Sequence, residues 1–232
     1  MKFLTSTAKD DDTWISTADM MAGLMMIFLF IAVIYIQNIS KYFDAVSDVR
    51  DEICNDLSNE FKNDLDQWNM TICEGGLLIR FQSDSSFERA SAKLSPSFES
   101  LLADFFPRLL HVIWKYKDSV SELRIEGHTD STVKRGATPV SGYIYNTELS
   151  QDRSRNVLRY ALNIPSISSN DGYLSWAFSS VTAHGMSSSN LIKAGTTELY
   201  DKSRRVEFRI KTRAEDELLN LVTELKRNEA KR

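Results

Sequence analysis

The chain has 232 residues, of which 42% are hydrophobic and 26% are charged, and its formal net charge is -4. This length allows one well-filled domain and an additional segment. Nucleic acid is not an expected partner, because binding phosphates needs a concentrated basic face, and here short acidic and basic runs alternate. The only cysteines, Cys54 and Cys73, have no CxxC spacing and no neighbouring histidine, which argues against a metal site.

The first segment of interest runs from Ile15 to Ile36 and is almost entirely apolar. At about 1.5 Å per residue it would be roughly 33 Å long as a helix, which matches a hydrocarbon core of about 30 Å. Trp14 and Tyr35 stand near its ends, where interfacial aromatic residues are common. Acidic residues precede it, whereas a cleaved signal peptide begins with basic residues, so the sequence predicts an uncleaved transmembrane helix over residues 14–37.

Asp19 lies inside this predicted span. An ionised carboxylate there costs about 2.5 to 3.5 kcal/mol, so we expect Asp19 to be neutral, paired, or facing a wet cavity, and to be functional. A lone helix cannot enclose an ion path, which indicates a partner with several helices. In the alternative interpretation the helix begins near Met20, and Asp19 merely caps it at the membrane surface.

The segment Ala18–Leu24, preceded by Trp14 and followed by several phenylalanines, resembles the transmembrane motif of the flagellar stator protein MotB and its relatives. In this resemblance Asp19 matches the ion-carrying aspartate of the family. The TolR and ExbD proteins share the motif, so this short segment alone does not identify one family.

Beyond the membrane segment, helical and strand patterns alternate, which indicates an α/β fold. We expect a helical stalk over 38–68 that packs as a pair, strands at 70–73, 77–82, 122–126, 180–184 and 204–211, and helices over 96–117, from about Asn146, and from Ala214. The predicted domains are therefore a cytoplasmic N-terminus (1–13), the transmembrane helix (14–37), the stalk (38–68), a folded domain (69–213) and a charged C-terminal helix (214–232). If the folded domain is periplasmic, Cys54 and Cys73 could form a disulfide, and two free thiols remain the alternative.

Three ordered blocks in the folded domain resemble the OmpA-like peptidoglycan-binding signature. They are Glu126–Asp130, Asn146–Val157 and Ser203–Glu207, and the earlier block Phe87–Pro96 is similar to the start of MotB-type versions of this domain. The resemblance spans residues 76 to 212 and implies an OmpA-like α+β sandwich. The chain departs from the family pattern in extra residues around 134–145 and in serines at positions 154 and 203.

In the family, the residues that match Asp130 and Arg153 grip the diaminopimelate of the peptidoglycan stem. This is chemically reasonable, because a zwitterionic amino-acid end needs a carboxylate for its ammonium group and a guanidinium for its carboxylate. Asn146 is expected to cap a helix and offer its backbone amide to an anion, and Thr129 and Arg204 complete the predicted site.

Plainer interpretations exist for single residues of this predicted site. Asp130 alone would be a turn aspartate, and Arg153 alone an exposed helix charge, but their spacing together favours the family site. His128 is expected to be structural, since no nucleophile pattern accompanies it. We therefore expect no catalytic residue, no enzyme activity and no cofactor.

An acid in the membrane joined to a wall-binding domain is the architecture of a rotary stator. Among stator relatives, the acidic N-terminus, the compact stalk and the charged C-terminal helix look more like the ZorB family of Zorya anti-phage systems than like flagellar MotB. This resemblance implies a homodimer in the bacterial inner membrane, with a cytoplasmic N-terminus and a periplasmic domain, joined by five MotA-like ZorA subunits. The alternatives are a flagellar or transporter-energising stator and a non-conducting tether to peptidoglycan.

Overall fold

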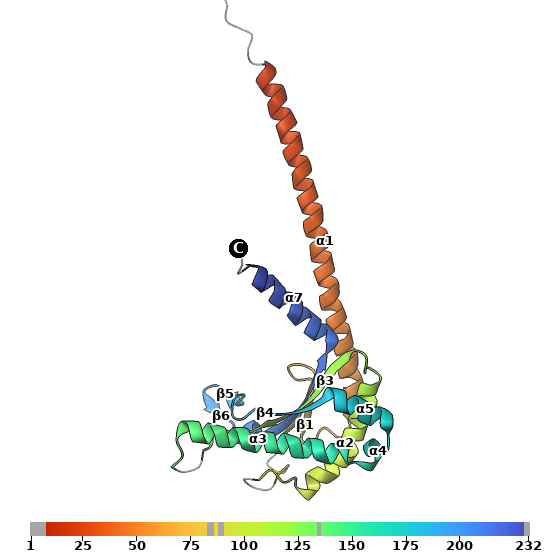
Figure 1. Ribbon diagram of the computed structural model, residues 1–232, viewed down its shortest axis with the longest axis vertical. Coiled ribbons are helices and arrows are strands. Elements are labelled where there is room, and N and C mark those ends of the chain that lie inside the picture. The colour runs from red at the N-terminus through yellow and green to blue at the C-terminus, as the bar shows by residue number, and fades with distance from the viewer. Residues whose placement is uncertain (1–7, 83–85, 88–90, 134–135, 230–232) are drawn as a thin grey trace, which may run out of the picture. The chain divides into compact units, whose positions relative to one another are not determined.

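The longest element of the computed structural model is helix α1 (Ala8–Phe61), which contains the apolar segment (Figure 1). The structure describes residues 8–82, 86–87, 91–133 and 136–229. The chain divides into two compact units, Met1–Ala45 and Val46–Arg232, and α1 contributes to both.

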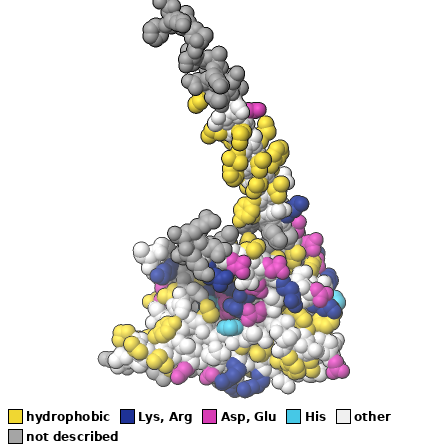
Figure 2. Space-filling view, turned by 45° about the horizontal axis from the view of Figure 1, so that its top comes forward, with side chains coloured by type: hydrophobic (Ala, Val, Ile, Leu, Met, Phe, Trp, Pro, Cys, Tyr) yellow, Lys and Arg dark blue, Asp and Glu magenta, His cyan; other side chains and the backbone are white. Residues whose placement is uncertain are grey.

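In the first unit, α1 carries a segment that is long and apolar enough to cross a membrane. This segment is Ser16–Lys41, with a mean hydropathy of 2.3, and none of it is buried within the chain. Figure 2 shows the hydrophobic side chains gathered along this part of α1. Because the helix begins at Ala8, Asp19 lies inside it, and the alternative of a helix that begins near Met20 with Asp19 as its cap is wrong.

The second unit is built on a five-stranded sheet with the strand order β1-β2-β7-β3-β4. All neighbouring strands are antiparallel except β3 and β4, which are parallel. The strands are β1 (Met70–Ile72), β2 (Leu78–Gln82), β3 (Val120–His128), β4 (Val181–Gly185) and β7 (Arg205–Thr212), and a separate hairpin consists of β5 (Lys193–Ala194) and β6 (Thr197–Glu198).

The described residues of this unit form six further helices, and the two longest that pack on the sheet are α2 and α3 (Figure 1). Their bounds are α2 (Pro96–Trp114), α3 (Pro139–Leu162), α4 (Pro165–Ser168), α5 (Asp171–Ser180), α6 (Tyr200–Ser203) and α7 (Arg213–Glu229). Alternate strand residues such as Phe81, Ile125 and Phe208 join buried residues of α2 and α3 in one core. The next residues along each strand point to the opposite face, where charged side chains predominate.

The end of α1 belongs to this core. Ile53, Leu57 and Phe61 are completely buried against it, so this part of the predicted stalk packs into its own domain and not against a second copy. Cys54 and Cys73 form a disulfide with a Cα to Cα distance of 6.0 Å, which ties α1 to the turn after β1. The alternative of two free thiols is therefore wrong for this structure.

The strands and the helix over 96–117 were predicted within a few residues, but the start of α3 was not. This helix begins at Pro139, with Thr138 as its N-cap, and not near Asn146. A threonine that accepts a hydrogen bond from the backbone, followed by proline at the first helical position, is a strong helix start. The elements α4, α5, α6, β5 and β6 were also missed, because each is short or weakly periodic in sequence.

Candidate functional site

The Thr129–Thr132 loop follows strand β3 directly and contains Asp130, whose carboxylate is fixed on both sides. Its Oδ1 accepts a hydrogen bond from the backbone N–H of Thr132 at 2.8 Å, and its Oδ2 lies 2.6 Å from Nη1 of Arg204. Arg204 also pairs with Asp201 on α6. Asp130 is only 7% exposed, and these contacts hold its carboxylate in one orientation.

Asn146 holds this loop in place through its side chain. Its Nδ2 donates hydrogen bonds to the backbone carbonyls of Asp130, at 3.3 Å, and Thr132, at 3.2 Å. The prediction that Asn146 caps a helix is wrong, because α3 begins at Pro139 and Asn146 stands in the helix interior. Its backbone amide is therefore not available to an anion, and its contribution comes from the amide side chain.

Two glycines set the distance between α3 and the sheet. A Cβ atom on Gly127 of β3 would overlap the carbonyl oxygen of Ser150, and one on Gly185 of β4 would lie 2.5 Å from the backbone nitrogen of Gln151. Only glycine permits so close an approach of helix and strand. The first half of α3 is thus held directly beside the loop that carries Asp130.

Arg153 lies on α3 seven residues after Asn146, which places both on the same side of the helix. It is 9% exposed, so the interpretation as an exposed helix charge is wrong. Its Nε donates to the carbonyl of Ser91 at 3.0 Å, and its guanidinium stands 4.8 Å from the ring centre of Phe87. Burial lowers the pKa of Arg153, and Arg204 lowers it further while Asp130 raises it; arginine nonetheless remains charged in proteins.

The structure thus brings Asp130, Asn146, Arg153 and Arg204 into one neighbourhood, as the sequence predicted. Thr129 lies in the same loop, and its N–H donates to the carbonyl of Ser187 at 3.0 Å. Its hydroxyl is buried and finds no hydrogen-bond partner within the described part of the chain. Thr129 therefore faces the interior beneath the loop. Part of the earlier block, residues 88–90, lies outside the described residues.

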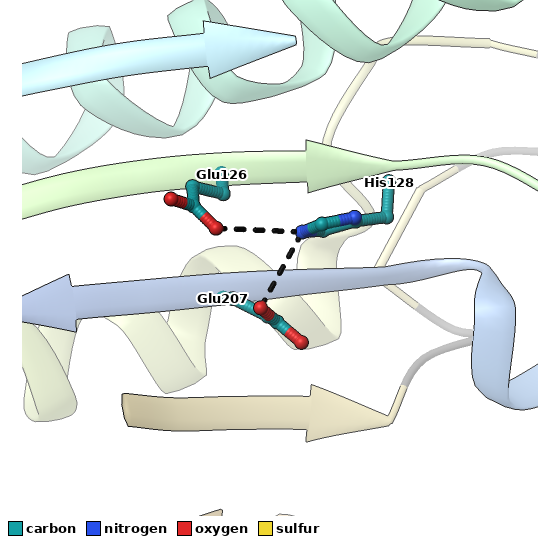
Figure 3. A group of neighbouring side chains, drawn as sticks. All are labelled: Glu126, His128 and Glu207. Carbon is teal, nitrogen blue, oxygen red and sulfur yellow. Dashed lines mark ion pairs between the residues drawn. The ribbon is translucent and has the colours of Figure 1, made fainter. Parts of the chain in front are cut away.

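Behind the loop, Glu126, His128 and Glu207 form a buried cluster on the charged face of the sheet (Figure 3). Nε2 of His128 lies 3.4 Å from Glu207 Oε2 and 3.7 Å from Glu126 Oε2. Three arginines surround the two carboxylates, because Arg80 and Arg205 contact Glu207 and Arg209 contacts both acids. His128 therefore has the structural place that the sequence predicted.

These contacts decide the charge state of the acids. Burial acts to raise the pKa of Glu207, but His128 and Arg205 outweigh it and hold that pKa far below its ordinary value. The pKa of Glu126 is lowered in the same way, against burial, by His128 and Arg209. Two carboxylates and an imidazole would suit a divalent cation, but the arginines already supply the positive charge and take most of the carboxylate oxygens. We therefore interpret the cluster as an ion-pair network.

No protein-family model matches the sequence. The Zorya protein ZorB of Escherichia coli (strain ATCC 8739) is 36% identical over 232 residues, which cover 96% of this chain and 97% of that protein. A putative MotB-like protein from Desulfovibrio vulgaris has a similar structure, with a TM-score of 0.50, 22% identity, and coverage of 71% of this chain and 91% of its own. For the periplasmic domain of Helicobacter pylori MotB the TM-score is 0.41 at 21% identity, covering 66% of this chain and 85% of that one.

The likeness to the Desulfovibrio protein confirms the predicted fold, an OmpA-like mixed α/β domain of the MotB type. The candidate site stands at the end of β3 in this fold, where the loop, α3 and the segment before β7 meet. The apolar helix segment with Asp19 belongs to the other unit of the same chain.

Proposed function

The chain belongs to the ZorB family of Zorya proteins, and from this premise we propose that it is the wall-anchored stator subunit of an ion-driven motor in the bacterial inner membrane, which acts in defence against phage. The observation that carries the proposal is the presence in one chain of a membrane-length apolar helix with an acid, Asp19, and an OmpA-like domain with Asp130 beside Arg153 and Arg204.

The chemistry of the second unit supports the proposed orientation. Disulfides such as Cys54–Cys73 persist in oxidising compartments, and the bacterial periplasm is one. Peptidoglycan lies in the same compartment, so the domain would be periplasmic and the N-terminus cytoplasmic. The chain would then pass once through the inner membrane.

In the membrane, Asp19 would carry the ion. The apolar segment is unburied within the single chain, so lipid and partner helices must cover it. We propose two copies of this chain with five MotA-like ZorA subunits, whose helices supply the rest of the ion path. One charge crossing about 100 mV supplies roughly 2.3 kcal/mol, comparable with the cost of ionising an acid in the span. We propose the proton as the ion.

In the periplasm, Asp130 and Arg153 would bind the diaminopimelate end of a peptidoglycan stem. The ligand ammonium would approach Asp130, whose carboxylate Arg204 holds in one orientation, and the ligand carboxylate would approach the guanidinium of Arg153. Such binding prevents this subunit from turning, so that ion flow drives the partner around it. The proposed role is mechanical, without catalysis.

Wall binding is tested by co-sedimentation of the full chain with purified sacculi. We expect Asp130→Ala and Arg153→Ala to lose most of the bound fraction, because each removes one charge of the pair. Asp152→Ala and Arg155→Ala are matched controls, since these two residues pair with each other on the exposed side of α3. Equal sedimentation of all four variants would refute the site.

The partner is tested by purifying the chain from membranes of its native cell and imaging what accompanies it. The proposal expects a ring of five MotA-like subunits around two copies of this chain. A complex that contains no multi-helix partner would leave only a tethered wall binder.

A further inference from the structure

The segment before β7 contacts the Asp130 loop through Arg204, which belongs to the family signature, and through Glu198, which does not. The segment, which we name the clamp, comprises the β5–β6 hairpin and α6, residues 193–204. At its end, Arg204 pairs with the Asp130 carboxylate at 2.6 Å. The other contact comes from the end of β6, which sequence reasoning did not identify.

This second contact joins Glu198 to Ser131, the residue that follows Asp130. Glu198 Oε1 accepts a hydrogen bond from the backbone N–H of Ser131 at 3.1 Å, and Oε2 accepts one from the Ser131 hydroxyl. Both carboxylate oxygens are therefore engaged with a single residue. Hydrogen bonds to a charged acceptor are stronger than those between neutral groups, so this pair fixes the loop better than an uncharged contact would.

The clamp is closed at its base through two hydrogen bonds with Ile192, the residue immediately before it. The N–H of Ile192 donates to the Ser203 hydroxyl at 3.0 Å, and the N–H of Leu199 donates to the carbonyl of Ile192 at 2.8 Å. Ser203 is fully buried, so α6 is anchored where the chain enters β7. Glu198 and Arg204 thus reach the loop from one fixed base and not from a loose surface loop.

We infer that Glu198 is a positioning residue for peptidoglycan binding, which acts through Ser131 to hold the Asp130 carboxylate in its ligand-binding orientation. This inference rests on the proposed wall-binding function. Asn146 secures the backbone carbonyls of the loop from α3, whereas Glu198 secures the N–H and side chain of Ser131 from the clamp. Without Glu198, the loop would be ordered only when the ligand binds, and the free-energy cost of this ordering would weaken binding.

The test is quantitative co-sedimentation of the full chain with sacculi, together with thermal unfolding of the same samples. We expect Glu198→Ala to lose wall affinity while the unfolding temperature stays close to that of the parent, because Ser131 is exposed at the surface. Glu198→Gln keeps one acceptor for the Ser131 N–H and should restore part of the affinity. Glu148→Ala, which removes an exposed acid from α3, is the matched control and should bind like the parent.

A double-variant comparison separates positioning from general stabilisation. Because Glu198 acts through Asp130, the loss caused by Glu198→Ala should disappear when Asp130 is already alanine. If Asp130→Ala loses binding but Glu198→Ala binds sacculi as well as the parent does, the inference is overturned and the proposed site remains intact. An additional loss from Glu198→Ala on the Asp130→Ala background would also overturn it. If the parent itself failed to bind sacculi, the proposed wall-binding function would fall first.

Discussion

At the scale of single residues, a small number of hydrogen-bond partners hold Asp130 in its orientation. Its two carboxylate oxygens have different partners, a backbone N–H and an arginine, and its own carbonyl is held by Asn146. Since the charged atoms and the backbone are fixed from separate elements, neighbours that never touch the ligand should influence binding. This makes the supporting residues as testable as Asp130 itself.

Asn146→Ala removes both side-chain hydrogen bonds to the loop carbonyls. We expect a loss of about 1 to 3 kcal/mol in the free energy of unfolding, because a buried carbonyl loses its donor, and weaker co-sedimentation with sacculi. Asn163→Ala is the control, since its Nδ2 donates to the backbone carbonyl of Arg159 at the exposed end of α3. Equal effects of the two changes on wall binding would show that Asn146 does not support the loop.

We expect Glu207 to make the stability of the domain depend on pH. Its pKa is lowered in the folded chain, against burial, by His128 and Arg205, from an ordinary value of 4.5. A carboxyl group with a lowered folded pKa stabilises the fold at pH values above its unfolded pKa, and this stabilisation is lost as the pH falls toward the folded pKa. We therefore expect the free energy of unfolding to decrease as the pH drops below about 4.5.

Glu207→Gln tests this linkage by urea unfolding of the full chain in detergent at neutral and acidic pH. The variant should be less stable at pH 7, because Arg205 and Arg80 lose a charged partner, and its stability should change less between pH 7 and pH 4. An acid dependence as steep as that of the parent would assign the effect to other carboxylates.

At the scale of elements, the disulfide is the feature with the clearest energetic consequence. It closes a loop with a sequence separation of 19 residues between α1 and the turn after β1. Loop-closure entropy predicts a stabilisation of about 3 kcal/mol for a loop of this length. The paired change Cys54→Ser with Cys73→Ser should lower the free energy of unfolding by that order.

Reducing agent provides the control for this prediction. It should destabilise the parent to a similar extent and leave the double serine variant unchanged, as measured by urea unfolding. If the parent is shown to contain free thiols after reduction and its free energy of unfolding is unchanged, the disulfide does not stabilise the fold.

The helices and strands also show which features of the fold could be predicted from the sequence and which could not. Strands such as β7 alternate apolar and charged residues, which identifies them and the face they bury. The start of α3 was misplaced because the predicted cap, Asn146, resembles a helix start in a family block, while the true signal, Thr138 before Pro139, lies among residues that depart from the family pattern. Glu198 was missed because its contact with Ser131 joins residues 67 apart in sequence, and no local pattern reports such a contact.

At the scale of the whole molecule, one chain joins two proposed sites, one in an apolar helix segment and one in a folded domain. The proposed wall-binding site was predicted from the order and spacing of three blocks, and the structure brings its charged residues together. Asp19 was predicted from the conflict between a carboxylate and an apolar span, and the structure places it within a helix segment of membrane length. The proposed motor needs both sites, since ion transfer at one yields rotation only if the other is held.

The central claim is tested most directly by measuring phage plating on cells that carry the complete system with Asp19→Asn in this chain. The change removes the titratable group and keeps the side-chain size, so protection should be lost although membrane levels and sacculus binding match the parent. Asp19→Glu, which keeps a carboxyl group, should retain part of the protection. Full protection by Asp19→Asn at matched expression would contradict the account.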